Sequence, residues 1–186
     1  PAWPRQLTFL PDKVWELHGT GAVPHLIAVS DAGGNERHQF YLISNFGVDA
    51  QGHEAHEVTR LTHNDDAIHE FGVFSKDGQE IVYTCNERNS VAFDIYRMDL
   101  RTGERRLLIE TDGPRQVVAW SPDGKQLLSL VEVAASEVDL YLLDLETLTE
   151  RRLTEGRTPA AYSSVQWTMG GIVLVSDATN DRGALC

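Results

Sequence analysis

Phe74-Ser75-Lys76-Asp77-Gly78 returns as Trp120-Ser121-Pro122-Asp123-Gly124, 46 residues further along the chain. A divergent third copy, Trp167-Thr168-Met169-Gly170-Gly171, follows 47 residues after the second. An aromatic residue followed by a short polar turn with glycine is typical of the junction between two antiparallel strands. The regular spacing therefore indicates a structural repeat.

Two further markers keep the same period. Asp94-Ile95-Tyr96-Arg97-Met98-Asp99-Leu100 recurs 45 residues on as Asp139-Leu140-Tyr141-Leu142-Leu143-Asp144-Leu145. Arg60-Leu61-Thr62 is echoed by Arg106-Leu107-Leu108 and by Arg152-Leu153-Thr154, with the leucines 46 residues apart each time. Three independent markers with one period predict a tandem array of similar units.

Each unit is expected to contain four short strands that are apolar on both faces. In the clearest unit we predict strands at His69–Phe74, Glu80–Cys85, Phe93–Met98 and Glu104–Ile109. Strands buried on both faces belong to a sheet that lies between two others. No segment keeps a helical period for a dozen residues, so the sequence predicts an all-β fold, a β-propeller of four-stranded antiparallel blades.

The repeat divides the chain, residues 1–186, into about three and a half blades. The first full unit is divergent, with strands expected at Val14–Gly19, His25–Ser30, His38–Ser44 and Glu57–Leu61 and a loop insertion from Asn45 to His56. The last unit is expected to begin with strands Tyr162–Thr168 and Ile172–Ser176. The predicted units are an outer strand at 4–8, blades at 14–62, 63–109 and 110–154, and the start of another blade at 155–186.

Composition argues against several classes of protein. The chain has 28 acidic and 16 basic residues, a net charge of −12, and no cluster of Lys and Arg. Neither nucleic acid nor an anionic membrane surface is therefore expected as a partner. Two cysteines, Cys85 and Cys186, are too few for a disulfide framework, and a cytoplasmic location is expected.

The sequence offers no catalytic set. The Gly-x-Ser-x-Gly motif of a nucleophilic serine is absent. His53-Glu54-Ala55-His56-Glu57, near His63 and His69, has its histidines three residues apart, whereas a helical zinc site needs four. We expect a solvated loop there, no metal and no cofactor. Cys85 is expected to be a small buried residue, and Trp120, with its equivalents Phe74 and Trp167, to be core between blades.

Polar loops are predicted between the second and third strands of each unit. Because these loops occupy the same place in every unit, they should share one face of the array. They are candidates for contacts to a docked domain or to substrate. The candidate residues are Asn35, Glu36, Arg37, Asn86, Arg88, Asn89, Asp181 and Arg182.

Nearly the whole chain resembles two groups of propellers. Trp120-Ser121-Pro122-Asp123-Gly124, followed by Asp139–Leu145 and Arg152-Leu153-Thr154, is similar to the repeat of TolB-like propellers and of the N-terminal propellers of the prolyl oligopeptidase family. The segments at 33–42, 86–96 and 162–177 resemble the acylaminoacyl-peptidase branch of that family. The TolB-like propellers are the second choice.

The peptidase resemblance implies a propeller that gates a separate α/β-hydrolase domain of the same polypeptide and helps to position short peptides. No catalytic residue of that family matches a position in this chain, so the chain alone should not hydrolyse peptides. The TolB resemblance instead implies a stand-alone protein-binding propeller in a periplasm. In either case we expect outer sheet faces to promote self-association, or else residues 5–8 to complete the sheet begun by Tyr162–Ser176.

Overall fold

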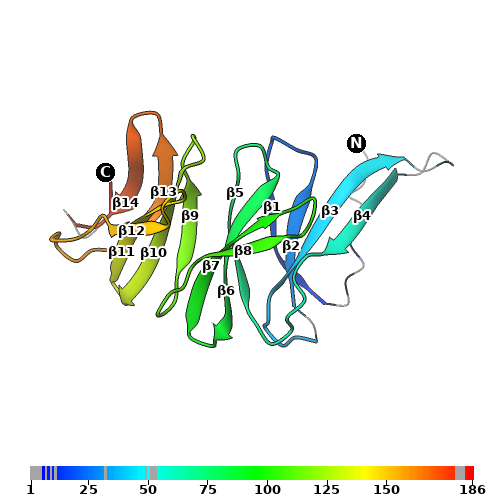
Figure 1. Ribbon diagram of the computed structural model, residues 1–186, viewed down its shortest axis with the longest axis horizontal. Helices are drawn as coiled ribbons and strands as arrows, with labels where there is room; N and C mark the ends of the chain where they lie inside the picture. Colours follow the sequence, from blue (N-terminus) through cyan, green and yellow to red (C-terminus); the bar gives the residue numbers. More distant parts are fainter. Residues whose placement is uncertain are drawn as a thin grey trace.

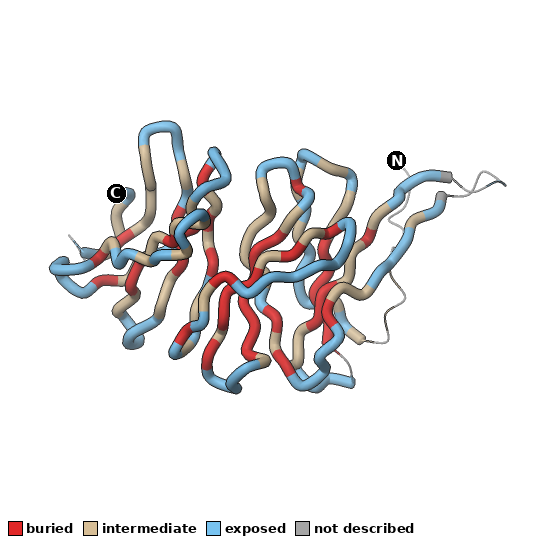
Figure 2. The backbone as a smooth tube through the Cα atoms, viewed as in Figure 1, coloured by how far each residue is buried: buried red, intermediate tan, exposed pale blue. Residues whose placement is uncertain are grey.

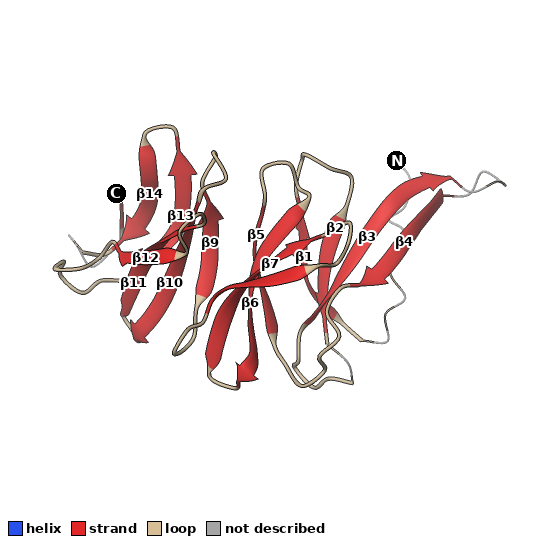
Figure 3. Ribbon diagram, in the orientation of Figure 1, coloured by secondary structure: helices blue, strands red, loops and turns tan. Residues whose placement is uncertain are grey.

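The computed structural model describes residues 6, 8, 10, 12–31, 33–48, 50, 54–178 and 183–186. Among these residues there are strands and loops but no helix (Figure 3). Four antiparallel sheets stand side by side, and the first and the last lie at opposite ends of the row (Figure 1). The all-β prediction is confirmed.

Three of the sheets have four strands and follow the order of the chain. The first sheet contains β1 (Val14–Gly19), β2 (Leu26–Ser30), β3 (Gln39–Val48) and β4 (Glu54–Arg60); the second contains β5 (His69–Phe74), β6 (Glu80–Asn89), β7 (Ala92–Asp99) and β8 (Arg105–Ile109); the third contains β9 (Gln116–Trp120), β10 (Gln126–Ala134), β11 (Glu137–Asp144) and β12 (Thr149–Arg152). The fourth contains β13 (Tyr162–Thr168), β14 (Gly171–Ser176) and β15 (Ala184–Leu185). The predicted outer strand at residues 4–8 lies largely outside the described residues, because only Gln6 and Thr8 of it are described.

Each pair of neighbouring sheets encloses its own apolar core. Ile81 and Tyr83 of β6 pack against the first sheet, while Val82, between them, packs against the third. In β10, Leu127 faces the second sheet and Leu128 the fourth. Alternate residues of one strand thus enter two cores, which explains why the strands are apolar on both faces. Figure 2 shows the buried segments where sheets face one another.

The prediction that Asn45–His56 forms a loop is wrong. β3 continues to Val48 and β4 begins at Glu54, so most of this segment is an extended hairpin. Asn45 takes a left-handed φ of 54°, and its Nδ2 donates a hydrogen bond to Glu57 Oε2 at 2.6 Å. This bulge interrupts the register between Ser44 and Gly47, after which pairing resumes. Asn45 tolerates the left-handed φ of the bulge and hydrogen-bonds across it to Glu57. The strand therefore continues where the sequence suggested a loop.

The repeated Ser-x-Asp-Gly turns are held by their own side chains. Ser75 Oγ donates to Asp77 Oδ1 at 2.7 Å, and Ser121 Oγ donates to Asp123 Oδ1 at 2.6 Å. These hydrogen bonds lower the pKa of both carboxyl groups. The glycine that follows takes a left-handed φ in each turn, 71° at Gly78 and 75° at Gly124. The shared sequence of the two turns therefore reflects shared geometry.

Only one of these two glycines also serves packing between sheets. A Cβ atom at Gly78 would lie 2.6 Å from Val23 Cγ2 and 2.8 Å from Thr20 Cγ2, whereas one at Gly124 would have no neighbour within 4 Å. We expect Gly124→Ala to lower the free energy of unfolding by about 1 kcal/mol through backbone strain alone. Gly78→Ala should cost about 1–3 kcal/mol more, because overpacking is added. Urea unfolding measures both, and equal losses would contradict the packing role of Gly78.

Candidate functional site

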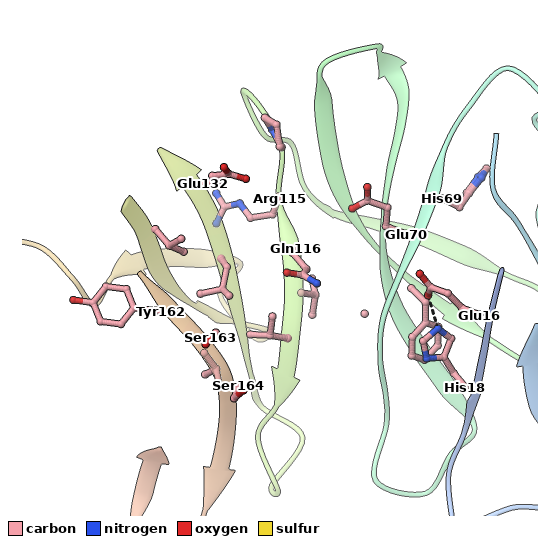
Figure 4. A pocket seen from close by; sticks show the side chains of 18 of the residues that line it. Glu16, His18, His69, Glu70, Arg115, Gln116, Glu132, Tyr162, Ser163 and Ser164 are labelled. Atoms are coloured by element: carbon pink, nitrogen blue, oxygen red, sulfur yellow. Dashed lines mark hydrogen bonds and ion pairs between the residues drawn. The ribbon is translucent and has the colours of Figure 1, made fainter. Parts of the chain in front are cut away.

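A cavity lies where the first strands of the four sheets converge. The strand β9 of the third sheet packs beside both β5 and β13, so the first strands lie innermost. They enclose a cavity of about 850 Å³, here called the inner pocket (Figure 4). Its walls contain Glu16, His18, Val29, His38, His69, Glu70, Phe71, Gly72, Pro114, Arg115, Gln116, Val117, Val118, Leu130, Glu132, Val138, Tyr162, Ser163, Ser164 and Val165.

Gly72 allows the second and third sheets to approach each other beside the pocket. A Cβ atom there would lie 2.6 Å from the backbone oxygen of Val82 and 2.9 Å from Val117 Cβ. The register of β5 against β6 also shifts between Phe71 and Val73. A residue without a side chain at this bulge lets β5 and β9 form one continuous wall.

Two charged side chains of the pocket are already paired. Glu16 Oε2 lies 2.7 Å from His18 Nε2, and the His18 ring stacks on Phe71 with 4.0 Å between centroids. Arg115 donates from Nη1 to Glu150 Oε1 and to Ser129 Oγ, each at 3.0 Å. The Arg115 side chain is only 9% exposed, and its guanidinium lies over the ring of Tyr141 at 4.5 Å. Arg115, which directly precedes β9, therefore ties this end of β9 to β12, and its charge is neutralised by Glu150.

Two carboxylates of the pocket have no such partner. Among the described residues, neither Glu70 nor Glu132 has a hydrogen-bonded or ionic partner within contact distance. Although the Glu70 side chain opens onto the pocket, loss of surrounding water raises its pKa; Glu16 raises it further, and His38 opposes the change. The pocket thus holds more negative than positive charge that is free to act on a ligand.

The candidate residues at 35–37 lie in the turn between β2 and β3. Asn35 Oδ1 accepts a hydrogen bond from the backbone N–H of Arg37 at 2.9 Å. The backbone N–H of Glu36 donates to Asp31 Oδ2 at 3.0 Å, and Glu36 has a left-handed φ of 58°. Asn35 and Glu36 are exposed and Arg37 is half-buried, so this turn presents polar side chains to solvent.

The candidate residues at 86–89 do not form the predicted loop. β6 continues to Asn89, and only Ser90 and Val91 make the turn. Asn86 is 5% exposed, and its Oδ1 accepts a hydrogen bond from the backbone N–H of Ile68 at 2.7 Å. The polar side chain of Asn86 thus makes hydrogen bonds within the fold. A sequence pattern alone does not distinguish such a residue from one in a solvent-exposed loop.

Arg88 and Asn89, like Asn86, make hydrogen bonds within the fold. Arg88 donates to both carboxylate oxygens of Asp94, at 2.7 and 2.8 Å, and to the Thr111 carbonyl at 2.7 Å. Asn89 Oδ1 accepts from the backbone N–H of Val91 at 3.1 Å. The remaining candidates, Asp181 and Arg182, lie outside the described residues.

The sequence reasoning missed the residues of the inner pocket. Glu16, Glu70 and Glu132 were not candidates, because each lies within a strand and not in a loop. The available signal was an acidic residue inside an otherwise apolar strand, which normally lies at an edge or lines a cavity. Only the meeting of four separate strands shows that these positions share one site.

The other sequence candidates are structural. Cys85 is fully buried between the first and second sheets, where burial raises the pKa of its thiol to about 12. Phe74, Trp120 and Trp167 each pack against one of the three cores, as predicted. His56, expected in a loop, lies in β4 and stacks on Phe46, while His53 lies outside the described residues. Within the described ranges, no group of three or more His, Cys, Asp or Glu side chains has metal-binding geometry.

The chain was compared with known families, proteins and structures. No family model matches it. The Tol-Pal system protein TolB of Francisella tularensis subsp. mediasiatica (strain FSC147) is 29% identical over 107 residues, which are 57% of this chain and 23% of TolB. The match therefore spans less than a quarter of the length of such curated relatives.

Solved structures decide the fold. TolB from Acinetobacter baumannii superposes with a TM-score of 0.59 and 19% identity, over 89% of this chain and 40% of TolB. The acylaminoacyl peptidase of Pyrococcus horikoshii superposes with a TM-score of 0.54 and 14% identity, over 88% of this chain and 28% of the peptidase. The fold is a β-propeller. In this propeller the four sheets are blades, and the inner pocket faces the central channel that such blades surround.

Both groups of the predicted resemblance thus occur among the structural neighbours, and TolB also matches in sequence. At these identities the structural likeness establishes the propeller and not its activity. Within the part of the chain that the structure describes, no helix has the length and apolar character needed to cross a bilayer.

Proposed function

We propose that this chain is the non-catalytic propeller of a serine peptidase of the prolyl oligopeptidase family. It would gate the path to a separate α/β-hydrolase domain of the same polypeptide and help to position short peptides. The observation that carries the proposal is the inner pocket, which is walled by all four blades and is polar where they converge. A cavity of about 850 Å³ is in the size range of ligand sites.

The geometry supports a passive gate. The strands that wall the pocket are held within each sheet by ladder hydrogen bonds, and in the third sheet also by the Arg115–Glu150 ion pair, so each wall would be rigid. A cavity of about 850 Å³ would admit a short extended peptide and not a folded protein. Gln116, Ser163 and Ser164 offer polar side chains to a passing backbone (Figure 4). Selection would therefore act on the size and conformation of a substrate before chemistry begins.

The polar turn at Gly33–Arg37 is the proposed contact with the hydrolase domain. The β2–β3 turn lies at the same end of the blades as the starts of β5, β9 and β13, and so at the pocket end of the channel. Glu36 and Arg37 are the side chains of this turn that we propose for an interdomain contact.

A stand-alone TolB-like propeller that binds other proteins is the second candidate. The observation that supports it is the sequence match to TolB over 107 residues. The peptidase proposal goes with a cytoplasmic location and the TolB-like one with a periplasmic location. Self-association through apolar outer sheet faces stays a prediction for either candidate function. Leu185, which is 77% exposed, lies on β15, the edge strand of the fourth sheet.

Activity of the complete polypeptide separates the two candidates. We expect it to hydrolyse short peptide substrates and to lose this activity on titration with a serine-directed inhibitor, while residues 1–186 alone show no turnover. Ser163→Trp in the pocket should lower kcat/KM more for a hexapeptide than for a dipeptide ester, because only the longer substrate is sensitive to the width of the channel. Ser90→Trp, in the β6–β7 turn, is the control. A complete polypeptide without peptidase activity would overturn the proposal.

A further inference from the structure

The first sheet is a self-contained unit at one end of the row of sheets (Figure 1). Its four strands come from residues 14–60 and are hydrogen-bonded to one another. Of the three apolar cores among the described residues, the first sheet takes part only in the core that it shares with the second sheet, whereas the second and third sheets each take part in two. In an array whose units are held by their neighbours, a terminal unit can open at the cost of a single interface.

His69, at the start of β5, ties the second sheet to the first at this interface. Its backbone N–H donates to the His38 carbonyl oxygen at 3.1 Å, and its Nδ1 lies 3.0 Å from the same oxygen. A carbonyl can only accept, so Nδ1 carries the proton and Nε2 carries none. The fully buried ring lies between Phe40 of the first sheet and Tyr83 of the second, with centroid distances of 5.8 and 6.0 Å. The neutral imidazole is thus part of the core that joins the two sheets.

The closed interface has no place for a second proton on this ring. Nε2 of His69 is buried and has no hydrogen-bond partner among the described residues, so a proton there would leave a donor and a positive charge without compensation. Burial therefore lowers the pKa of His69 to about 4. The His38 carbonyl and the charge of Glu87 oppose this shift. Arg105 and Arg60 lower the pKa slightly further.

The other titratable side chains around this ring do not respond to acid in the same way. Tyr83 and Cys85 lie in the same core, and burial raises the pKa of both, so they stay uncharged as the pH falls. The imidazoles of His18 and His38 are only half-buried and line the inner pocket, so they can carry charge in contact with water. The buried imidazole of β5 is therefore the group whose protonation is incompatible with the closed interface.

We propose that protonation of His69 releases the first sheet from the second as a unit, which makes the interface between them an acid-sensitive switch. The open interface exposes the ring to water, where the charged form is stable. Opening removes one wall of the inner pocket, because Glu16, His18 and Val29 belong to the first sheet. Acid would thus open the pocket on this side while the third and fourth sheets stay folded. This switch does not require the chain to serve a peptidase.

Amide hydrogen exchange distinguishes the opening of one sheet from the unfolding of the whole chain. Exchange would be followed by mass spectrometry at pH 7 and pH 4.5, with rates corrected for the intrinsic effect of pH. A ring with a pKa of 6.5 when open and about 4 when closed shifts the opening equilibrium about 50-fold over this range. The protection of β2 and β3 in the first sheet should therefore fall about 50-fold.

The fourth sheet is the matched control within the same molecule. It also stands at an end of the row and shares a single core with its neighbour, but residues 155–186 contain no histidine. The protection of β13 and β14 should therefore change by less than about 3-fold between the two pH values.

Two variants assign the effect to one histidine. His69→Phe keeps a ring in the core but cannot titrate, and it should abolish the fall in protection of the first sheet. His18→Phe keeps the stack on Phe71 at the same interface and removes a histidine that reaches the pocket, so the fall should remain about 50-fold. If His69→Phe does not fold at pH 7, as judged by circular dichroism, His69→Gln provides the comparison, because its amide can donate to the His38 carbonyl without titrating.

An equal fall in the protection of the first and fourth sheets would show that acid acts on the whole chain as one cooperative unit, and would overturn the proposal. Protection of the first sheet that does not change with pH would also overturn it, as would a fall that persists when His69 is replaced. These measurements need only residues 1–186, so a complete polypeptide without peptidase activity would overturn the proposed function and leave the acid-sensitive switch unaffected.

Discussion

Asp94→Ala is expected to lower the free energy of unfolding by about 3 kcal/mol or more. The carboxylate is fully buried at the start of β7, where it accepts two hydrogen bonds from Arg88 and one from the backbone N–H of Thr111 at 2.7 Å. Burial by itself would raise the pKa of Asp94, but the hydrogen bonds from Arg88 and Thr111 outweigh it and lower the pKa. Removal of the carboxylate leaves a guanidinium and a buried N–H without their partner.

Urea unfolding followed by circular dichroism measures this loss. Asp112→Ala, which removes an exposed carboxylate three residues beyond β8, is the control and should change stability by less than about 0.5 kcal/mol. A loss at Asp94 no larger than at Asp112 would show that the Arg88–Asp94 pair adds nothing to the blade.

Acidification from pH 6.5 to about 4 is expected to cost the folded chain about 3 kcal/mol through His69 alone. Burial lowers the pKa of His69 from 6.5 to about 4; the hydrogen bond to the His38 carbonyl and the charge of Glu87 oppose this shift, while Arg105 and Arg60 lower the pKa slightly further. Between these values the unfolded chain binds a proton that the folded chain does not. The stabilisation is therefore complete above pH 6.5 and is lost as the pH falls toward 4.

His69→Phe should remove this pH dependence, because phenylalanine keeps the ring contacts with Phe40 and Tyr83 but cannot titrate. The urea midpoint would be measured from pH 7 to pH 4.5 for both proteins. Asp94, whose pKa is lowered by Arg88 and Thr111, does not confuse the result, because it is present in both proteins and contributes equally to both profiles. His63→Phe, at an exposed loop position, is the control. Parallel pH profiles for the original chain and His69→Phe would contradict the prediction.

The architecture could be predicted because it depends on local patterns that repeat. The turn at Ser75–Gly78 and its copy at Ser121–Gly124 carry their hydrogen bonds within four residues of sequence. Strands that are apolar on both faces imply sheets on either side, and three cores between four sheets confirm this. β5 and β13 begin and end where the pattern placed them.

Polar side chains were harder to place because their meaning depends on the partner that the fold supplies. Asn86 and Arg88 have the composition of a loop, yet Ile68 and Asp94, which lie on neighbouring segments, hold them within a strand hairpin. Asn45 was assigned to an insertion, yet Glu57 stabilises it in a bulge. In each case the deciding contact involves a residue that a local pattern does not reveal.

The sequence by itself determined the repeat, the strands and the sandwiched sheets, because hydrophobic alternation and turn chemistry act over a few residues. Only the tertiary structure decided the site. Glu16, Glu70, Glu132 and Arg115 are distant in sequence and share one pocket because the first strands of the blades converge. Which carboxylates are paired and which are free depends on distances between those strands, and such distances arise only when the sheets pack together.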